Sequence, residues 1–562
     1  MKLNREILRL AVPSIFANIT VPLVGMVDIA VVGHLGATGD IGGAAFIGGI
    51  SIGTMIFDLL YWNFAFLRAG TGGLTAQAYG RLLAAGVPLR PADTATNPAF
   101  GRCANSARFA HGDTPDNGRC ANSASFAHGD TPDNGRCANS ARFAHGELGR
   151  ILLRALRIAL LAGLALIALQ WVAVKLAFLV VKCSPEVQSL ASQYFYIRIW
   201  AAPATLSLFA FKGWFIGLQD SVRPMTADLL VNLLNIVLSA ALAFGWAGLP
   251  RLGFTGVAFG TVIAQWSGFL YCLLTSRRRY RHIFASHSLS ATSRIHVCAN
   301  GADMNQENVD SEALSFGTAE TTDNTEAPEK QSFFSMNRDL VLRSAGMIAV
   351  YIGFTVISAR FGDKMLSVSA ILMKLLMLFS YFTDGFAYAG EALTGRFIGE
   401  CSADGVRSTV RGTFAWGAGV AALFMLVYGF GGVPVLHLMT SDQSVVEAGR
   451  EFLPWLLLMP MIGCPAFVWD GVFIGATATK DLRNSTLLSA IGFFGAWFAG
   501  IALAGTRLTP ELAIHILMAA YFVHLAIRTV YQTFRWKPLF SKVFPADNRQ
   551  HEGQQAGAEP EN

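Results

Sequence analysis

Charged residues are scarce in this chain, and their scarcity excludes a soluble globular protein. Only 14% of its 562 residues are Asp, Glu, Lys or Arg, whereas 53% are hydrophobic. Long apolar runs with few charges are typical of helices that cross a lipid bilayer. The composition therefore predicts an all-α integral membrane protein. Its net charge of +6 fits the basic bias of cytoplasmic loops and does not indicate nucleic-acid binding.

Cysteine is also sparse, and no sequence motif supplies catalytic chemistry. Of eight cysteines, Cys272 and Cys464 lie in apolar runs, and Cys103, Cys120 and Cys137 recur in a short repeat. This spacing matches neither a disulfide framework nor a zinc site, so we predict no metal and no cofactor. The chain also lacks a P-loop and any nucleophile motif, which argues against an enzyme and against transport driven by ATP.

Twelve apolar runs fall into two groups of six. We therefore predict twelve transmembrane helices, and the excess of Lys and Arg in alternate connections places both termini in the cytoplasm. The runs lie at about residues 10–33, 41–67, 151–181, 194–218, 225–247 and 252–276, and at about 340–360, 365–395, 412–440, 452–475, 484–506 and 512–534.

Polar stretches divide the chain into domains. Residues 86–146 hold three near-identical copies of a 17-residue unit, beginning at Gly101, Gly118 and Gly135. Copies this similar indicate a recent duplication rather than a set of metal sites. The predicted domains are a six-helix lobe at 1–85 and 147–281, the insert at 86–146, a disordered linker at 282–337, a second lobe at 338–536 and a polar tail at 537–562.

The two lobes carry the same short motifs. The motif at 74–80 matches that at 393–399 at an offset of 319, and the motif at 211–217 matches that at 469–475 at an offset of 258. The offsets differ by 319 − 258 = 61, which is the length of the insert at 86–146. Since each repeat has an even number of spans, the predicted pseudo-two-fold axis runs along the membrane normal, as in alternating-access transporters.

Four stretches resemble a known family. They are Met26 to Gly36, Phe66 to Thr71, the loop from Gly213 to Pro224, and Asn232 to Leu238. Together they resemble the multidrug and toxic compound extrusion (MATE) family, nearest to its DinF-like branch. The resemblance implies an antiporter that exports small amphipathic organic cations in exchange for protons or sodium, and that acts as a monomer in the lipid bilayer of the bacterial inner membrane.

Asp28 is the leading candidate for ion coupling. It is a single acid in an apolar run from Leu10 to Gly39, and an ionised group in hydrocarbon costs about 2.5 kcal/mol or more. The resemblance places the family's ion-linked acid at Asp28, with sodium as an open possibility. Asn232, Asn235 and Ser239 share one face of the fifth span and complete the predicted coupling site. Pairing of Asp28 with a basic neighbour, and purely structural hydrogen bonding by the asparagines, remain alternatives.

Further polar residues lie in other spans. Asp384, Tyr388 and Glu391 share one helical face and, with Asp58, are candidates for a substrate cavity. A buried pair with a basic neighbour is the alternative. Lys212 and Asp470 occupy equivalent repeat positions with opposite charges, so we predict that they face each other as an inner gate.

The competing functions are a flippase for lipid-linked saccharides and a scaffold without transport activity. A flippase of this class has a strongly basic cavity, whereas the candidate cavity residues here are acidic. A scaffold leaves the intramembrane acids unexplained. A single carboxylate suffices for proton coupling, so the sequence favours the proton over sodium.

Overall fold

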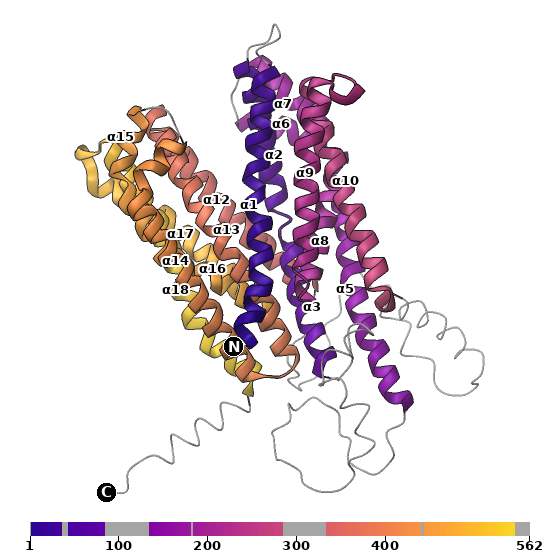
Figure 1. The fold of residues 1–562 in the computed structure, drawn as a ribbon. Coiled ribbons are helices and arrows are strands. Elements are labelled where there is room, and N and C mark those ends of the chain that lie inside the picture. Colours follow the sequence, from indigo (N-terminus) through magenta and orange to yellow (C-terminus); the bar gives the residue numbers. More distant parts are fainter. Residues whose placement is uncertain are drawn as a thin grey trace, which may run out of the picture.

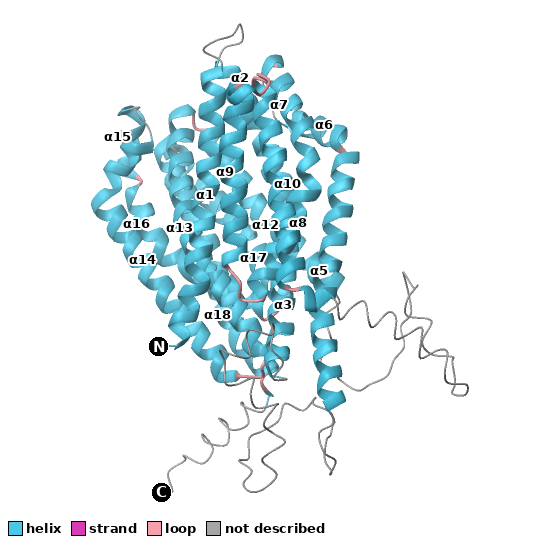
Figure 2. Ribbon diagram, turned by 45° about the vertical axis from the view of Figure 1, so that its right-hand side comes forward, coloured by secondary structure: helices cyan, strands magenta, loops and turns pink. Residues whose placement is uncertain are grey.

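The structure, a computed structural model, describes residues 2–35, 43–84, 134–180, 184–284, 333–439 and 443–545. Within these ranges every regular element is a helix (Figure 2). The predicted all-α class is confirmed. Helices are expected here because the backbone of a membrane span must satisfy its own hydrogen bonds.

The first lobe contains α1 to α10. Its helices are α1 (Lys2–Leu35), α2 (Gly43–Trp62), α3 (Phe66–Ala84), α5 (Asn134–Ala168), α6 (Gln170–Val180), α7 (Pro185–Arg198), α8 (Ala202–Gly217), α9 (Val222–Phe244) and α10 (Phe254–Arg279).

The second lobe contains α12 to α18. Its helices are α12 (Phe333–Ala359), α13 (Asp363–Gly399), α14 (Ala403–Met439), α15 (Gln443–Glu451), α16 (Leu453–Gly475), α17 (Thr479–Ala504) and α18 (Pro510–Val543).

Twelve membrane spans result from these elements. Eleven segments of the described chain are long and apolar enough to cross a bilayer, and α2 with α3, like α7 with α8, forms one span. The twelfth is α1, a 34-residue helix that lies between the lobes (Figure 1). A helix of this length extends about 51 Å, which exceeds the thickness of the hydrocarbon core.

Figure 1 shows two bundles that approach each other at one end and diverge at the other. Helix α1 begins at the closed end and α18 ends there, and we call this end the inner end. There α3 packs against α13 and α16, and α1 packs against α13. The structure therefore represents a state that is closed between the lobes at the inner end.

Glycines allow this close packing, and they do so in equivalent pairs. A Cβ atom added to Gly213 would lie 2.1 Å from the carbonyl oxygen of Arg68 on α3, and one added to Gly471 would lie 2.0 Å from the carbonyl oxygen of Ala387 on α13. Arg68 and Ala387 are themselves 319 residues apart, the offset found in the sequence. The helix contacts thus follow the repeat, and the two-lobe architecture is confirmed.

Three boundaries differ from those read from the sequence. Helix α5 begins at Asn134, inside the 86–146 insert, because its third copy continues the helix of the following span. Helix α12 begins at Phe333, before the expected end of the linker, and α18 extends to Val543, past the expected start of the tail. The first two copies of the repeat and most of the linker lie outside the described residues.

Candidate functional site

Asp28 lies in the outer half of α1 and is buried against α9. Its side chain is only 8% exposed, and within the described chain its Oδ1 atom has no hydrogen-bond partner. Asn235 and Ser239 of α9 interact with the carboxylate, as the sequence predicted. A carboxylate that is buried but incompletely bonded is costly, which identifies a position where a cation or proton can bind.

A hydroxyl network fixes the asparagine beside this carboxylate. The Ser239 hydroxyl donates to Asn235 Oδ1 at 2.9 Å, and the Thr261 hydroxyl of α10 donates to the same oxygen at 3.1 Å. Both lone pairs of the amide oxygen are therefore occupied. Gly260 permits this contact, because a Cβ atom there would lie 2.6 Å from the backbone nitrogen of Ser239.

Asn232 does not join the Asp28 site. Its Nδ2 atom donates to the Thr20 hydroxyl of α1 at 2.5 Å, two helical turns before Asp28. In this structure Asn232 therefore bonds Thr20 instead of Asp28, and its part in ion coupling stays a prediction. Along parallel helices, a residue three positions earlier on α9 sits about 4.5 Å lower and meets an earlier residue of α1.

Sequence reasoning missed Arg198 of α7, which lies close to the Asp28 site. Its guanidinium donates to the Tyr194 hydroxyl at 3.0 Å and to the Thr54 hydroxyl at 3.4 Å, and it lies 4.8 Å from the centre of the Phe57 ring. It interacts electrostatically with both Asp28 and Asp58. The sequence signal that could have identified Arg198 is its position as a basic residue near the start of the apolar run at 194–218.

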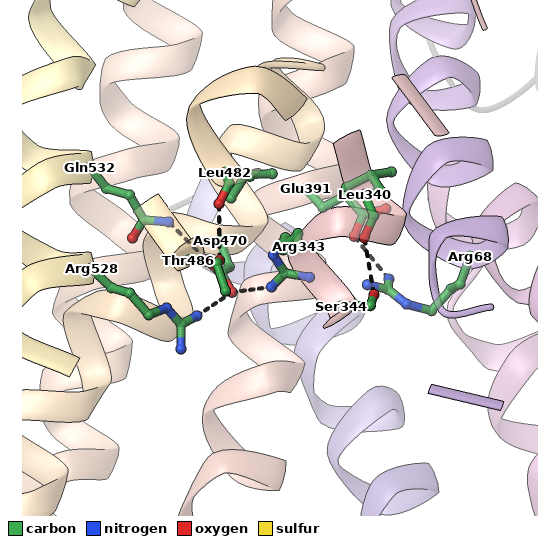
Figure 3. A network of polar contacts seen from close by, with 10 residues as sticks. All are labelled: Arg68, Leu340, Arg343, Ser344, Glu391, Asp470, Leu482, Thr486, Arg528 and Gln532. Atoms are coloured by element: carbon green, nitrogen blue, oxygen red, sulfur yellow. Dashed lines mark hydrogen bonds and ion pairs between the residues drawn. The ribbon is translucent and has the colours of Figure 1, made fainter. Parts of the chain in front are cut away.

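Asp470 of α16 is the centre of a second polar cluster, in the other lobe (Figure 3). It forms a short ion pair with Arg343 of α12, accepts from Arg528 of α18 at 2.5 Å, and accepts from Gln532 at 2.8 Å. Arg528 is 1% exposed. These contacts neutralise and fully engage the carboxylate. No sequence signal indicated the roles of Arg343 and Arg528, because each lies within a predicted span and no pattern within a span reports its partner on another helix.

The predicted gate between Lys212 and Asp470 is wrong. Lys212 instead pairs with Asp228 of its own lobe, with 2.6 Å between Nζ and Oδ1. Asp470 is committed to two arginines of the other lobe. Equivalent positions in the repeat therefore have opposite charges because each satisfies a different partner within its own lobe.

The four substrate-cavity candidates fall into two places. Glu391 pairs with Arg68 of the first lobe at 3.0 Å (Figure 3). The same guanidinium lies 4.5 Å from the centre of the Tyr388 ring. The alternative of a buried pair with a basic neighbour thus describes Glu391. Asp58 and Asp384 form no ion pair within the described residues.

Two tyrosines connect those two acids. Tyr381 interacts electrostatically with both Asp58 and Asp384, and Tyr351 interacts with Asp58. The Tyr351 ring also packs against the Trp62 ring, with 5.1 Å between centroids. Acidic and aromatic side chains from both lobes therefore lie together between α2, α12 and α13. Within the described residues, no cluster of His, Cys, Asp and Glu side chains is arranged to hold a metal ion.

The sequence family described as MatE matches residues 13–82, 142–241 and 340–498, which is more than half of the chain. The chain belongs to the MatE family. The matched ranges include Asp28, Asn235 and Asp470, and the resemblance found in the sequence is confirmed.

MatE relatives match the chain over most of its length. DNA damage-inducible protein F of Escherichia coli is 29% identical over 95% of this chain and 92% of its own length. Protein DETOXIFICATION 42 of Arabidopsis thaliana is 24% identical over 58% of this chain and 57% of its own length.

Solved MatE-like structures share the fold. A MOP superfamily transporter from Pyrococcus furiosus has a TM-score of 0.63 at 16% identity and covers 96% of both chains. The eukaryotic MATE transporter AtDTX14 has a TM-score of 0.65 at 12% identity and covers 97% of this chain and 98% of its own. These similarities establish a twelve-helix, two-lobe membrane fold.

Proposed function

We propose that this protein is an efflux transporter that exports small amphipathic organic cations by proton antiport. The observation that carries the proposal is the buried Asp28 carboxylate, which has an unpartnered oxygen in a membrane span of a two-lobe protein. Relatives named for multidrug resistance support the substrate class, including a probable multidrug resistance protein of Bacillus subtilis that matches part of the chain. The protein acts as a monomer in the inner membrane, with both termini cytoplasmic.

The proposed substrate site lies between the lobes. Asp58 and Asp384 supply negative charge, and Tyr351, Tyr381 and Trp62 supply aromatic faces. A cation is attracted both to carboxylates and to the electron-rich face of an aromatic ring, by about 0.5–2 kcal/mol for each ring. The same side chains offer apolar area to the rest of an amphipathic compound.

Proton coupling is favoured by how the Asn235 oxygen is used. A sodium ion requires several oxygen ligands, but both lone pairs of this oxygen already accept bonds from Ser239 and Thr261. Asp28 therefore offers one carboxylate and few free ligands. A proton requires only that carboxylate. Binding of a proton would remove the charge that Asn235, Ser239 and Arg198 surround, and would allow the α1–α9 contact to rearrange.

The basic residues of the membrane region do not favour a flippase. Arg68 is paired with Glu391, and Arg343 and Arg528 are paired with Asp470. Each of these three arginines is engaged by a carboxylate, and the proposed substrate site itself contains Asp58 and Asp384, so its acidic lining does not favour a phosphate headgroup.

Dye efflux from proteoliposomes tests the proposal. The purified protein should export a cationic dye when a proton gradient is imposed, and should not respond to a sodium gradient without a pH gradient. Parallel liposomes with Asp28→Asn should show neither response. Robust transport driven by sodium alone would overturn the assignment of the proton, and absence of dye transport under both gradients would overturn the substrate class.

A further inference from the structure

The contact between α3 and α13 lies along the pseudo-two-fold axis. A Cβ atom on Gly80 would lie 2.9 Å from the Cα of Gly399, and one on Gly399 would lie 2.8 Å from the Cα of Gly80. These two glycines are 319 residues apart and are therefore each other's repeat equivalents. Residues that face their own equivalents lie on the symmetry axis, so the axis passes through this crossing.

Gly72 and Glu391 form a second pair of equivalents on the same axis. They too are 319 residues apart, and a Cβ atom on Gly72 would lie only 1.9 Å from Glu391 Oε1. A carboxylate at both positions would place two like charges in contact. Gly72 on α3 leaves room for the Glu391 carboxylate from α13, so this contact on the axis holds a single acid.

Arg68 of the first lobe holds this acid. Its Nη1 lies 3.0 Å from Glu391 Oε2 (Figure 3). Its guanidinium also lies 4.5 Å from the centre of the Tyr388 ring, one turn earlier on α13. Glu391 is fully buried and Arg68 is 19% exposed. The second oxygen of Glu391 has no hydrogen-bond partner within the described chain.

We propose that the Arg68–Glu391 ion pair, seated against Gly72, is the latch that keeps the inner end closed. The pair joins the two lobes at the axis, so it must separate whenever the lobes part at that end. While the pair is intact the two charges are compensated, whereas removing one partner leaves a largely buried charge that opening of the inner end would hydrate more fully. Arg68 and Glu391 are thus positioning residues for the transport cycle.

Inter-lobe distances measured with spin labels test the latch. Labels are attached at Arg150→Cys on α5 and Lys537→Cys on α18, both exposed side chains near the inner end, after replacement of the eight native cysteines. The latch rests on the proposed transport function, but the distances between the labels are recorded without substrate and without an ion gradient. A failure of the latch is therefore separable from a failure of the coupling or the substrate class.

Three variants carry the test. Glu391→Gln should lower the ratio of closed to open inner ends at least about tenfold. Gly72→Ala should shift the ratio in the same direction, because its methyl group displaces the carboxylate from Arg68. The double variant Arg68→Gln/Glu391→Gln should shift less than Glu391→Gln alone, since it leaves no unpaired charge.

Gly419→Ala is the matched control, because a Cβ atom at this exposed position of α14 would meet nothing within 4 Å. Its distance distribution should equal that of the parent. A merely structural ion pair would lower the melting temperature of Glu391→Gln but leave its distance distribution unchanged, and that outcome overturns the latch. If Glu391→Gln fails to reach the membrane, an unchanged distribution in Gly72→Ala overturns it.

Discussion

Asp28 and Asp470 are each 8% exposed, yet the two lobes treat these acids in opposite ways. In the first lobe Asp28 interacts with the Asn235 amide, the Ser239 hydroxyl and, electrostatically, with Arg198, but it forms no ion pair, and one carboxylate oxygen has no hydrogen-bond partner in the described chain. In the second lobe Asp470 binds two arginines and a glutamine. Burial alone therefore does not mark a functional acid in a membrane protein; the bonding left unsatisfied around it does.

Replacing these two acids should therefore have different costs in the free energy of unfolding. An acid held by two guanidinium groups is a structural centre, because removing it leaves two buried positive charges. An acid with one oxygen unbonded, whose nearby arginine is not paired directly with it, can gain and lose a proton with less disturbance of its surroundings.

Replacement of Asp28 should have the largest effect on transport. Asp28→Asn keeps the shape of the side chain but cannot change its charge, so proton-driven efflux should fall to the rate of empty liposomes while the melting temperature is retained. Dye efflux and thermal unfolding of the same preparation give both numbers. Normal efflux by this variant would mean that Asp28 does not couple transport.

Replacement of Asp470 should instead lower stability. Asp470→Asn leaves Arg343 and Arg528 without a carboxylate, at a cost of about 3–5 kcal/mol in the free energy of unfolding. Thermal unfolding in detergent measures the loss. Asp404→Asn is the control, because the Asp404 side chain is 96% exposed and its pairing with Arg407 should contribute little. Equal melting temperatures for the two variants would contradict the contrast between the lobes.

The pairing of Lys212 gives a smaller effect. A double-mutant cycle of Lys212→Met with Asp228→Asn should show a coupling energy of about 0.5–1 kcal/mol, because the two groups are 2.6 Å apart and partly exposed. The same cycle with Asp470→Asn should be additive within about 0.5 kcal/mol. Strong coupling of Lys212 to Asp470 would restore the inner gate that the structure contradicts.

Removal of the insert should have the smallest effect. Arg81 at the end of α3 and Glu147 on α5 are 2.6 Å apart, so a short connection can join these helices, as the one between α13 and α14 does. Deletion of about residues 86–146 should leave dye efflux unchanged. A deletion variant that reaches the membrane but no longer transports would show that the repeated segment has acquired a function.

The spans followed from apolar runs in the sequence and the repeat from matched motifs, whereas the family resemblance implied that the α9 residues lie beside Asp28. Asn235 and Ser239 lie one turn apart, so they had to share a face. The position of Asn232 depended on the height of α1 beside α9, which periodicity does not determine. The partners of Lys212 and Asp470 depended on which helices lie beside them, and no pattern within either span reports a lateral neighbour.

Helix α1 belongs to the first lobe by sequence but contacts both lobes. Near its start Glu6 pairs with Arg396 of α13 at 3.3 Å, and Asn18 donates to the carbonyl oxygen of Tyr381 at 3.3 Å. Beyond Thr20 it packs on α9. Pro13 and Pro22 interrupt its backbone hydrogen bonds and permit bending. Helix α1 thus carries Asp28 in its outer half and contacts the opposite lobe near its start, so a change of charge at Asp28 can be passed along one helix to the contacts that close the inner end.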